Sequence, residues 1–388
     1  MSRVYDVIVA GAGPSGLHFS RNLASEGFEV LLLEEKEDIT KNVLCSGIVG
    51  EELFENFDIP RELILREIST VRLISPSGAV SIYKHPFPFA YVTDRDKFNA
   101  YLFKKAIDCG VEIRLSHRVI DAETTGNGVE VKAFNFKDDR LETFKGKVLI
   151  LATGMKVRLS KKLGLGYPVN FFKSAQKTIK LNWDYVTIIT GSRFSKGGFA
   201  WIAPERDGFA KVGLITEGDA REGFENLLET YLPQENKQGV RFKLIVQGPL
   251  SKTFGERVIS VGECAGHIKS TTGGGIYYGL ISSEIASEVI LKAIKENNFS
   301  SQNLSLYEKL WKERLFREIQ SGNSLRELWK KLNDEQIERL FSLVSFLIKF
   351  DKPFNFLVKN LKFDWHARVL SSLLKIKNIK EFFEKVEV

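Results

Sequence analysis

The sequence is poor in cysteine and histidine, with three of the first and five of the second among its 388 residues. Three cysteines do not make the disulfide framework of a small secreted protein, so we expect a reducing, cytoplasmic compartment. No cysteine–histidine cluster has zinc spacing, and no Gly-x-Ser-x-Gly segment marks a serine hydrolase. We therefore expect no metal site, and His267 is expected to be hydrogen-bonded or solvent-facing rather than a ligand.

Long apolar runs are also missing. The best candidate, Leu340–Ile348, is too short to span a bilayer, and no charged region precedes an apolar segment at the N-terminus as in a signal peptide. The net charge is +7 and the isoelectric point about 9.0. The basic residues are scattered, however, and no RNA- or DNA-binding signature accompanies them, so no nucleic-acid partner is expected.

The most informative segment that is present is residues 4–35. An apolar strand, Val4–Ala10, runs into a Gly-x-Gly-x-x-Gly motif, and a helical pattern and a second apolar run follow. In a dinucleotide-binding βαβ unit the three glycines permit a tight turn, the approach of a pyrophosphate and close packing of the helix on the strand. These roles fall to Gly11, Gly13 and Gly16. Glu34 follows the second apolar run, where a carboxylate can accept hydrogen bonds from ribose hydroxyls.

In the rest of the chain, the spacing of apolar residues changes first to an alternating pattern and then to a helical one. Residues 38–57 are expected to be loop-like, and 96–109 to form a helix. Residues 165–250 alternate between apolar and polar positions and are interrupted by turn residues, which is typical of an antiparallel sheet. From Ile276 onward the pattern is mostly helical. The expected fold class is therefore α/β joined to α+β, with a Rossmann-like part, an antiparallel sheet and a helical C-terminal region.

Four separated pieces occur in the order seen in flavoproteins of the para-hydroxybenzoate hydroxylase fold. They are the N-terminal glycine motif with its acidic residue, a helix start at Asp94-Arg95, Ala152–Gly154, and the glycine segments Gly262–Gly266 and Gly273–Gly275. Among these proteins the chain most resembles the geranylgeranyl reductase family. The segments that carry this resemblance are Cys45-Ser46-Gly47, Gly197–Leu214 and Thr271–Ser287.

The resemblance implies where FAD binds. Ser15 would lie beside the pyrophosphate, Glu34 on the adenosine ribose and Arg95 on the phosphates, for which a guanidinium is a well-matched partner. Val119 would contact the adenine through its backbone, and Glu263, in place of the usual Asp, would bind the ribitol. The full set of implied FAD contacts is Gly11, Gly13, Ser15, Gly16, Glu34, Cys45, Ser46, Gly47, Arg95, Val119, Glu263, Gly274, Gly275 and Ile276.

Cys45 and Trp201 are the candidate catalytic residues. The resemblance implies that Cys45 lines the reaction cavity, where a thiol could help to protonate carbon or shape the pocket; the alternative is a small buried apolar residue. Trp201 and Pro204 match the family's substrate-side motif, whereas Phe199 and Ala203 depart from it. For Trp201 the alternative is ordinary packing in the core of a sheet.

The reaction that the resemblance implies is the reduction of polyprenyl chains. Reduced FAD would deliver a hydride to one carbon of an isolated alkene, and a proton would be added to the other. The expected substrate is a long-chain isoprenoid or lipid, and the expected electron donor is NAD(P)H or a ferredoxin. The alternatives are an aromatic monooxygenase or a flavin halogenase of the same fold, and a non-catalytic protein that binds flavin or lipid.

The expected domains are discontinuous in the sequence. Residues 1–65, 90–160 and 252–298 would form the FAD-binding domain, 66–89 and 161–251 an antiparallel β substrate domain, and 299–388 a helical C-terminal region. Aromatic and basic residues interleave in this last region, which predicts either a lid or surface facing a membrane, or a helical layer packed on the protein. The segments concerned are Leu325–Leu332, Ile337–Phe350, Phe354–Phe363 and Val369–Phe383.

Overall fold

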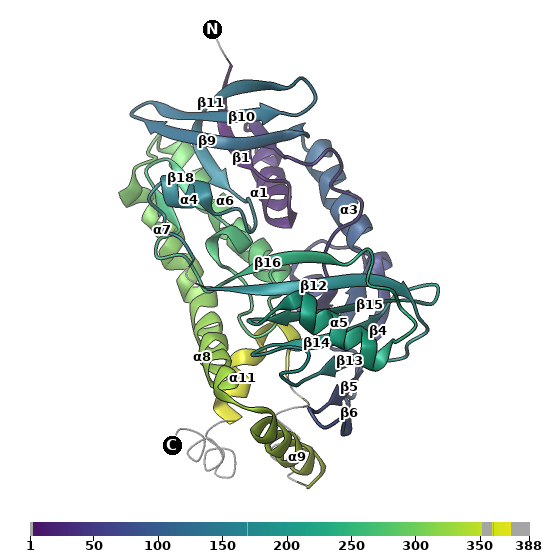
Figure 1. Cartoon of the computed structure of the whole chain (residues 1–388). Coiled ribbons are helices and arrows are strands. Elements are labelled where there is room, and N and C mark those ends of the chain that lie inside the picture. Colours follow the sequence, from purple (N-terminus) through teal and green to yellow (C-terminus); the bar gives the residue numbers. More distant parts are fainter. Residues whose placement is uncertain (1–2, 169, 351–358, 360, 374–388) are drawn as a thin grey trace.

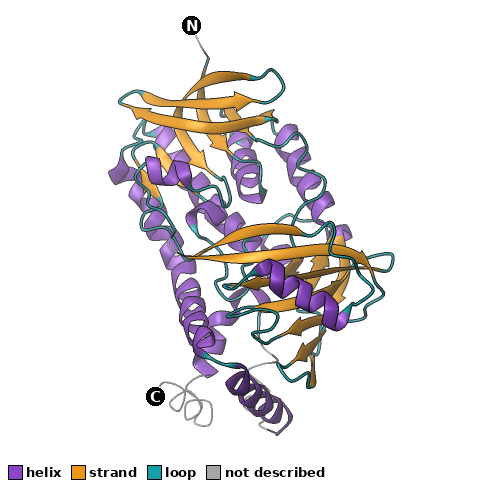
Figure 2. Cartoon of the chain, viewed as in Figure 1, coloured by secondary structure: helices purple, strands orange, loops and turns teal. Residues whose placement is uncertain are grey.

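The computed structural model describes residues 3–168, 170–350, 359 and 361–373 of the chain. A sheet built on the opening motif occupies one end of the molecule (Figures 1 and 2). Its central strand, β1, pairs in parallel with a strand on each side, and each of these has a further parallel neighbour. In spatial order the strands are β17 (Phe254–Gly255), β18 (Val258–Ser260), β11 (Arg140–Leu151), β1 (Val4–Ala10), β2 (Val30–Leu33) and β8 (Glu112–Arg114).

Helices and a hairpin cover this sheet. On one face α1 (Pro14–Ser25) contacts both α3 (Arg95–Asp108) and α6 (Ile276–Lys295). The hairpin of β9 (His117–Thr125) and β10 (Gly128–Asn135) extends from β11, and its side chains pack with α4 (Arg158–Lys162) in a second core cluster. Cover on both faces explains why the apolar run of β2 is buried along its whole length.

The second sheet is antiparallel except where β13 runs parallel to β5. This confirms the alternation expected for residues 165–250, with the addition of α5 (Ala220–Tyr231), which the sequence analysis did not identify. Asp219 caps that helix by accepting hydrogen bonds from the amides of Arg221 and Glu222. The strands in order are β16 (Arg241–Gln247), β12 (Asn170–Lys180), β15 (Phe209–Thr216), β14 (Phe199–Pro204), β13 (Val186–Ile189), β5 (Thr70–Ile74) and β6 (Val80–Lys84).

A small third sheet lies within the segment that was expected to be loop-like. Here the expectation for residues 38–57 was wrong, because this segment contains β3 and α2. Both elements are short and depend on tertiary partners: β3 pairs with β7, which is far away in the sequence. The elements of this part are β3 (Ile48–Gly50), α2 (Glu51–Asn56), η1 (Arg61–Leu63), β4 (Ile64–Ile68) and β7 (Ala90–Thr93).

The C-terminal region is helical, as expected, and runs along one side of the molecule from the first sheet toward the second (Figure 1). The expected segment Phe354–Phe363 and the end of Val369–Phe383 lie mostly outside the described residues. None of the described helices is long and apolar enough to cross a membrane. The elements are α7 (Ser301–Trp311), the π-helical turn η3 (Lys312–Phe316), α8 (Arg317–Lys331), α9 (Asp334–Phe350), η4 (Phe363–Trp365) and α11 (His366–Leu373); the short turn η2 (Gly262–Ala265) precedes α6.

Buried polar contacts attach the end of the described chain to the body of the protein. Glu318, on α8, is 2% exposed and accepts hydrogen bonds from the backbone amides of Ala367 and Arg368 at the start of α11. Its carboxylate thereby satisfies amides that have no partner within the helix. Thr271 and the His366 ring are 2.6 Å apart. These contacts fix the position of Asp364, which is central to the site described next.

Candidate active site

A cavity of about 930 Å³ lies between the first sheet and the second. Its wall includes the segments that follow the carboxyl ends of β1 and β2, which is where parallel α/β sheets bind their ligands. The opposite wall comes from β12, β14, β15 and β16 of the second sheet. The predicted site residues on the wall are Gly11, Gly13, Ser15, Glu34, Cys45, Ser46, Arg95, Val119, Trp201, Glu263, Gly274, Gly275 and Ile276.

The three glycines of the opening motif have different surroundings. Gly11 has φ of +108°, and a Cβ there would overlap the carbonyl oxygen of Ala152. A Cβ on Gly16 would overlap the carbonyl oxygen of Gly11, so this position keeps α1 close to β1. Gly13 is different, because a Cβ there would meet no atom within 4 Å and the residue borders the cavity. Gly13 therefore leaves the N-terminus of α1 open.

Two predicted residues, Gly16 and Gly47, are not on the cavity wall among the described residues. Gly47 has φ of +81°, and a Cβ there would lie 2.7 Å from the carbonyl oxygen of Thr93. Its conformation and its close packing both require glycine. Their role as FAD contacts stays a prediction, while their packing roles follow directly from this geometry.

Glu34 is held by the backbone on both sides of it. One carboxylate oxygen accepts a hydrogen bond from the Ala12 amide at 2.8 Å, and the other accepts one from the Lys36 amide at 3.0 Å. The residue is 9% exposed and borders the cavity. These two hydrogen bonds fix the orientation of the carboxylate relative to the glycine motif.

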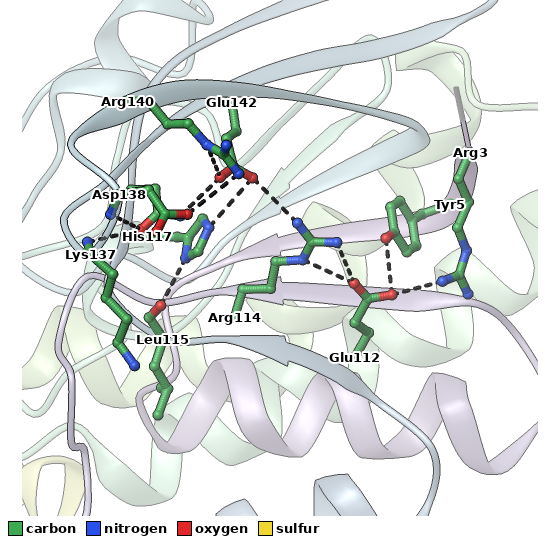
Figure 3. A network of polar contacts seen from close by, with 11 residues as sticks. Arg3, Tyr5, Glu112, Arg114, Leu115, His117, Lys137, Asp138, Arg140 and Glu142 are labelled. Carbon is green, nitrogen blue, oxygen red and sulfur yellow. Dashed lines mark hydrogen bonds and ion pairs between the residues drawn. The ribbon is translucent and has the colours of Figure 1, made fainter. Parts of the chain in front are cut away.

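An ion-pair network supports the neighbouring end of the cavity (Figure 3). Arg114 bonds both Glu112, at 2.8 Å, and Glu142, at 3.3 Å. The His117 ring contacts the Leu115 carbonyl at 2.7 Å through Nδ1 and lies 3.7 Å from Glu142 through Nε2. His117 is also on the cavity wall beside Val119. The network thus fixes β8 and β9, and β9 carries Val119, the residue expected to contact the adenine.

Arg95 is buried beside Cys45. The residue is 4% exposed; Nη2 donates to Asn99 Oδ1 at 2.9 Å, whereas Nε and Nη1 have no partner among the described residues. Burial alone would raise the pKa of the Cys45 thiol, but Arg95, the Gly47 amide, Lys211 and Lys243 outweigh it and lower the pKa. The thiol is therefore tuned toward its thiolate form.

Labelling of Cys45 by iodoacetamide is expected to become fast at a lower pH than for an ordinary thiol, because the thiolate is the reactive form. Arg95→Met removes the charge that lowers the pKa of Cys45 most and should move the midpoint to higher pH. Mass spectrometry of each cysteine checks this, with Cys109 at the other end of α3 as the internal control. A Cys45 midpoint that Arg95→Met leaves unchanged would contradict the assigned cause.

Glu263 forms a pair that the sequence analysis did not anticipate. Its Oε2 accepts a hydrogen bond from Lys243 Nζ at 2.7 Å, while Oε1 is buried without a partner among the described residues. Lys243 lies on β16 with Ile245 two residues further on, and both border the cavity. The period-two pattern of that strand was a signal that Lys243 faces inward.

The N-terminus of α6 points to the same cavity. Gly274, Gly275 and Ile276 are on the wall, and no side chain in the described part of the chain caps this 20-residue helix. Its first amides are therefore free to bind an acceptor, with the positive end of the helix dipole behind them.

Trp201 is both a core residue and a cavity residue. It is 8% exposed, packs with Phe172, Ala203 and Ile215, and borders the cavity. A Cβ on Gly213 of the neighbouring strand would lie 2.5 Å from the Trp201 ring, so glycine makes room for it. The packing expected as the alternative for Trp201 is therefore present, and its catalytic role stays a prediction.

The expectation for His267 was wrong. The residue is fully buried, and neither ring nitrogen has a partner among the described residues. Its ring lies 4.5 Å from that of Trp311, which comes from α7. Burial lowers the pKa of His267 to about 3, so the ring is neutral. The sequence could not reveal this, because the burying side chain comes from a distant helix.

Comparisons with known proteins show the family of this chain. The family model described as pyridine nucleotide-disulphide oxidoreductase matches residues 5–191. Two curated archaeal relatives are both named digeranylgeranylglycerophospholipid reductase. That of Methanocaldococcus jannaschii is 29% identical over 358 residues, which are 88% of this chain and 90% of the relative. That of Methanococcus vannielii is 30% identical over 353 residues, 87% of this chain and 89% of the relative. The chain belongs to the geranylgeranyl reductase family.

A solved structure supports the fold expected of the geranylgeranyl reductase family. The crystal structure of a geranylgeranyl bacteriochlorophyll reductase-like protein from Thermoplasma acidophilum superposes with a TM-score of 0.85 at 21% identity, and the match covers all of both chains. The expected fold class is thereby confirmed, and the fold is an FAD-binding one. The protein is an FAD-dependent oxidoreductase of this family.

The residues present in this geranylgeranyl reductase family member fit FAD. Arg95, whose Nε and Nη1 are donors without partners, borders the same cavity as the free amides of α6, and both suit phosphate oxygens. The open face at Gly13 admits a pyrophosphate close to the backbone. Glu263 retains one free acceptor for a hydroxyl.

Several wall residues of this family member were not among the sequence predictions. Among them are His117 from β9 of the first sheet, Lys243 from the second sheet, Lys269 from the glycine-rich loop and Asp364 from the C-terminal region. Only Lys243 had a local signal, since the others depend on which segments pack together.

Proposed function

We propose that this protein is an FAD-dependent reductase that saturates the C=C bonds of geranylgeranyl or other polyprenyl groups on a lipid or isoprenoid. The observation that carries the proposal is the shared cavity. Its polar wall fits a dinucleotide, and its apolar wall is formed by Trp201, Ile215 and Ile245. The names of the relatives agree with a prenyl lipid substrate.

The chain's residues have separable roles in this proposal. Gly13, Arg95 and the N-terminus of α6 hold the phosphates, while Glu34 and Glu263 accept from the cofactor's hydroxyls. Bound FAD supplies the hydride chemistry, which no side chain can supply. Trp201 and its apolar neighbours position the prenyl chain and exclude water. Cys45 borders the cavity and its carbonyl accepts a hydrogen bond from Gln176 of the second sheet at 3.3 Å, so we assign to it the shaping of the reacting pocket.

The electron donor and the surroundings of the enzyme are further parts of the proposal. We propose NAD(P)H or a ferredoxin as the source of electrons. A lipid substrate also favours peripheral contact with a membrane. On α9, Phe346 and Phe350 are 57% and 61% exposed and their rings are 4.9 Å apart, which suits such contact.

Anaerobic reoxidation of the reduced holoenzyme tests this function. A digeranylgeranyl phospholipid should restore the oxidised flavin spectrum without oxygen, and the product mass should rise by two hydrogens per bond reduced. A saturated lipid of the same headgroup is the control and should have no effect. Reoxidation that requires oxygen together with an aromatic substrate would favour the monooxygenase alternative instead. NADH, NADPH and reduced ferredoxin, each tried separately for the reductive step, identify the donor.

A further inference from the structure

An ion pair on the cavity wall joins the parts of the molecule that are built on the two sheets. Lys243 Nζ donates a hydrogen bond to Glu263 Oε2 at 2.7 Å, and both residues border the cavity. Lys243 lies on β16, the edge strand of the second sheet (Figure 1), whereas Glu263 lies in η2, which follows β18 of the first sheet. The pair therefore brings one positive and one negative charge to the cavity.

The strand geometry determines the direction of the Lys243 side chain. Ile245, two residues further along β16, and Ser174, the partner of Lys243 on β12, also border the cavity. Side chains alternate between the two faces of a strand, and paired residues on neighbouring strands lie on the same face. Lys243 therefore stands on the face of the second sheet that is turned toward the cavity.

The carboxylate of Glu263 has one oxygen that this pair does not use. Oε1 is buried and has no hydrogen-bond partner among the described residues, while Oε2 is bound to Lys243. A Cβ on Gly154 would lie 3.7 Å from Oε2, so the carboxylate lies beside the segment that follows β11. In the proposed function Oε1 accepts a hydrogen bond from a hydroxyl of the cofactor. Lys243 is then one hydrogen bond removed from the group that holds FAD.

The charge of Lys243 also acts on Cys45, which borders the same cavity. Burial would raise the pKa of the Cys45 thiol, and Lys243 is one of the charged groups that outweigh burial and lower it. Of the other two cations that act on this thiol, Arg95 is assigned to the phosphates. Lys211 is paired with Glu205 at 2.7 Å and is not on the cavity wall among the described residues. Lys243 is therefore the one of the three that is available to act on the redox-active part of the cofactor.

We propose that the Lys243–Glu263 pair sets the reduction potential of bound FAD, with Lys243 as the group that stabilises the reduced cofactor. This inference rests on the FAD site of the proposed function and is independent of the substrate. Two electrons pass to the cofactor, which is reduced, from one NAD(P)H or two ferredoxins, which are oxidised, and the protons come from the donor or from water. A nearby cation stabilises the added negative charge and a nearby carboxylate destabilises it. Lys243 therefore favours the entry of electrons, and Glu263 opposes it.

Charge changes of opposite sign test the proposal. Anaerobic reductive titration of the FAD-saturated protein at pH 8, beside a reference dye, measures the midpoint potential. Lys243→Gln should shift the equilibrium toward oxidised FAD about tenfold, which lowers the potential of a two-electron couple by about 30 mV. Glu263→Gln should shift it about tenfold the other way, and the double variant should lie between the two. Lys243→Arg keeps the charge and should stay near the wild-type potential.

Lys173→Gln is the matched control, because Lys173 is an exposed lysine next to Ser174 on β12 and so belongs to the other face of the sheet. This variant removes the same charge and should keep the wild-type potential. A wild-type potential in Lys243→Gln overturns the proposal while the proposed function stands. A shift in the same direction in Lys243→Gln and Glu263→Gln also overturns it, because a loosened site rather than charge would then be the cause. A wild-type protein that takes up no FAD overturns the proposed function and, with it, this inference.

Discussion

Gly13→Val is expected to weaken FAD binding by at least about 100-fold, or about 2.7 kcal/mol, while the protein still folds. Gly13 has φ of −70° and ψ of 174°, which valine can adopt, and a Cβ there meets no protein atom within 4 Å. The added methyl groups would instead occupy the cavity where we place the pyrophosphate. Titration of the apoprotein with FAD, followed by flavin fluorescence, measures the change.

Gly126→Val is the matched control for that variant. Gly126, in the exposed turn between β9 and β10, also has open space around a Cβ. It should therefore bind FAD as the wild type does, with a similar melting temperature. If Gly13→Val bound FAD as tightly as Gly126→Val, no cofactor group would approach the backbone at Gly13, and the placement of the pyrophosphate would be wrong.

Lys269→Met is expected to destabilise the fold by about 3–5 kcal/mol. Asp364, which is 1% exposed, would lose the ammonium group that lies 2.6 Å from its carboxylate, and breaking a buried ion pair by removing one partner is costly. Urea denaturation of the apoprotein at pH 8 measures the loss.

Two further variants test whether the loss of folding stability in Lys269→Met comes from the unpaired buried charge. Lys97→Met removes a lysine that is 63% exposed and lies 3.8 Å from Asp94, so it should cost less than about 1 kcal/mol. Lys269→Met combined with Asp364→Leu should recover much of the stability, since no unpaired charge remains. A Lys269→Met variant as stable as Lys97→Met would show that the buried pair contributes little.

Much of the fold could be predicted from local patterns. β1, α1 and β2 were predictable because apolar periodicity and glycine chemistry act over a few residues. The strands of the second sheet were predictable from their alternation. By contrast β3 and α2 are too short to have a clear period, and they form because β7 and the C-terminal segment pack on them.

The residues of the candidate site also include some that the sequence could predict and others that only the folded chain brings together. Motif and spacing predicted the glycines and Glu34, the family resemblance implied Arg95, and the structure brings most of these residues to one wall. Lys269 and Asp364, in contrast, are separated by 95 residues and meet only in the folded chain. A sequence pattern cannot show that two such charges are buried together, because burial depends on which helices cover the loop. His267 was misjudged for the same reason.

The way the C-terminal helices enter the body has a practical consequence for anyone shortening this chain. Tyr307 and Trp311 of α7 are fully buried, and they donate hydrogen bonds to the Ser260 carbonyl at 2.9 Å and to Thr253 Oγ1 at 2.8 Å. A protein ending at residue 298 would expose the underside of its nucleotide-binding sheet to aggregation and lose Asp364. Any variant library, chimera or crystallisation trial should therefore retain the C-terminal helices together with the nucleotide-binding part.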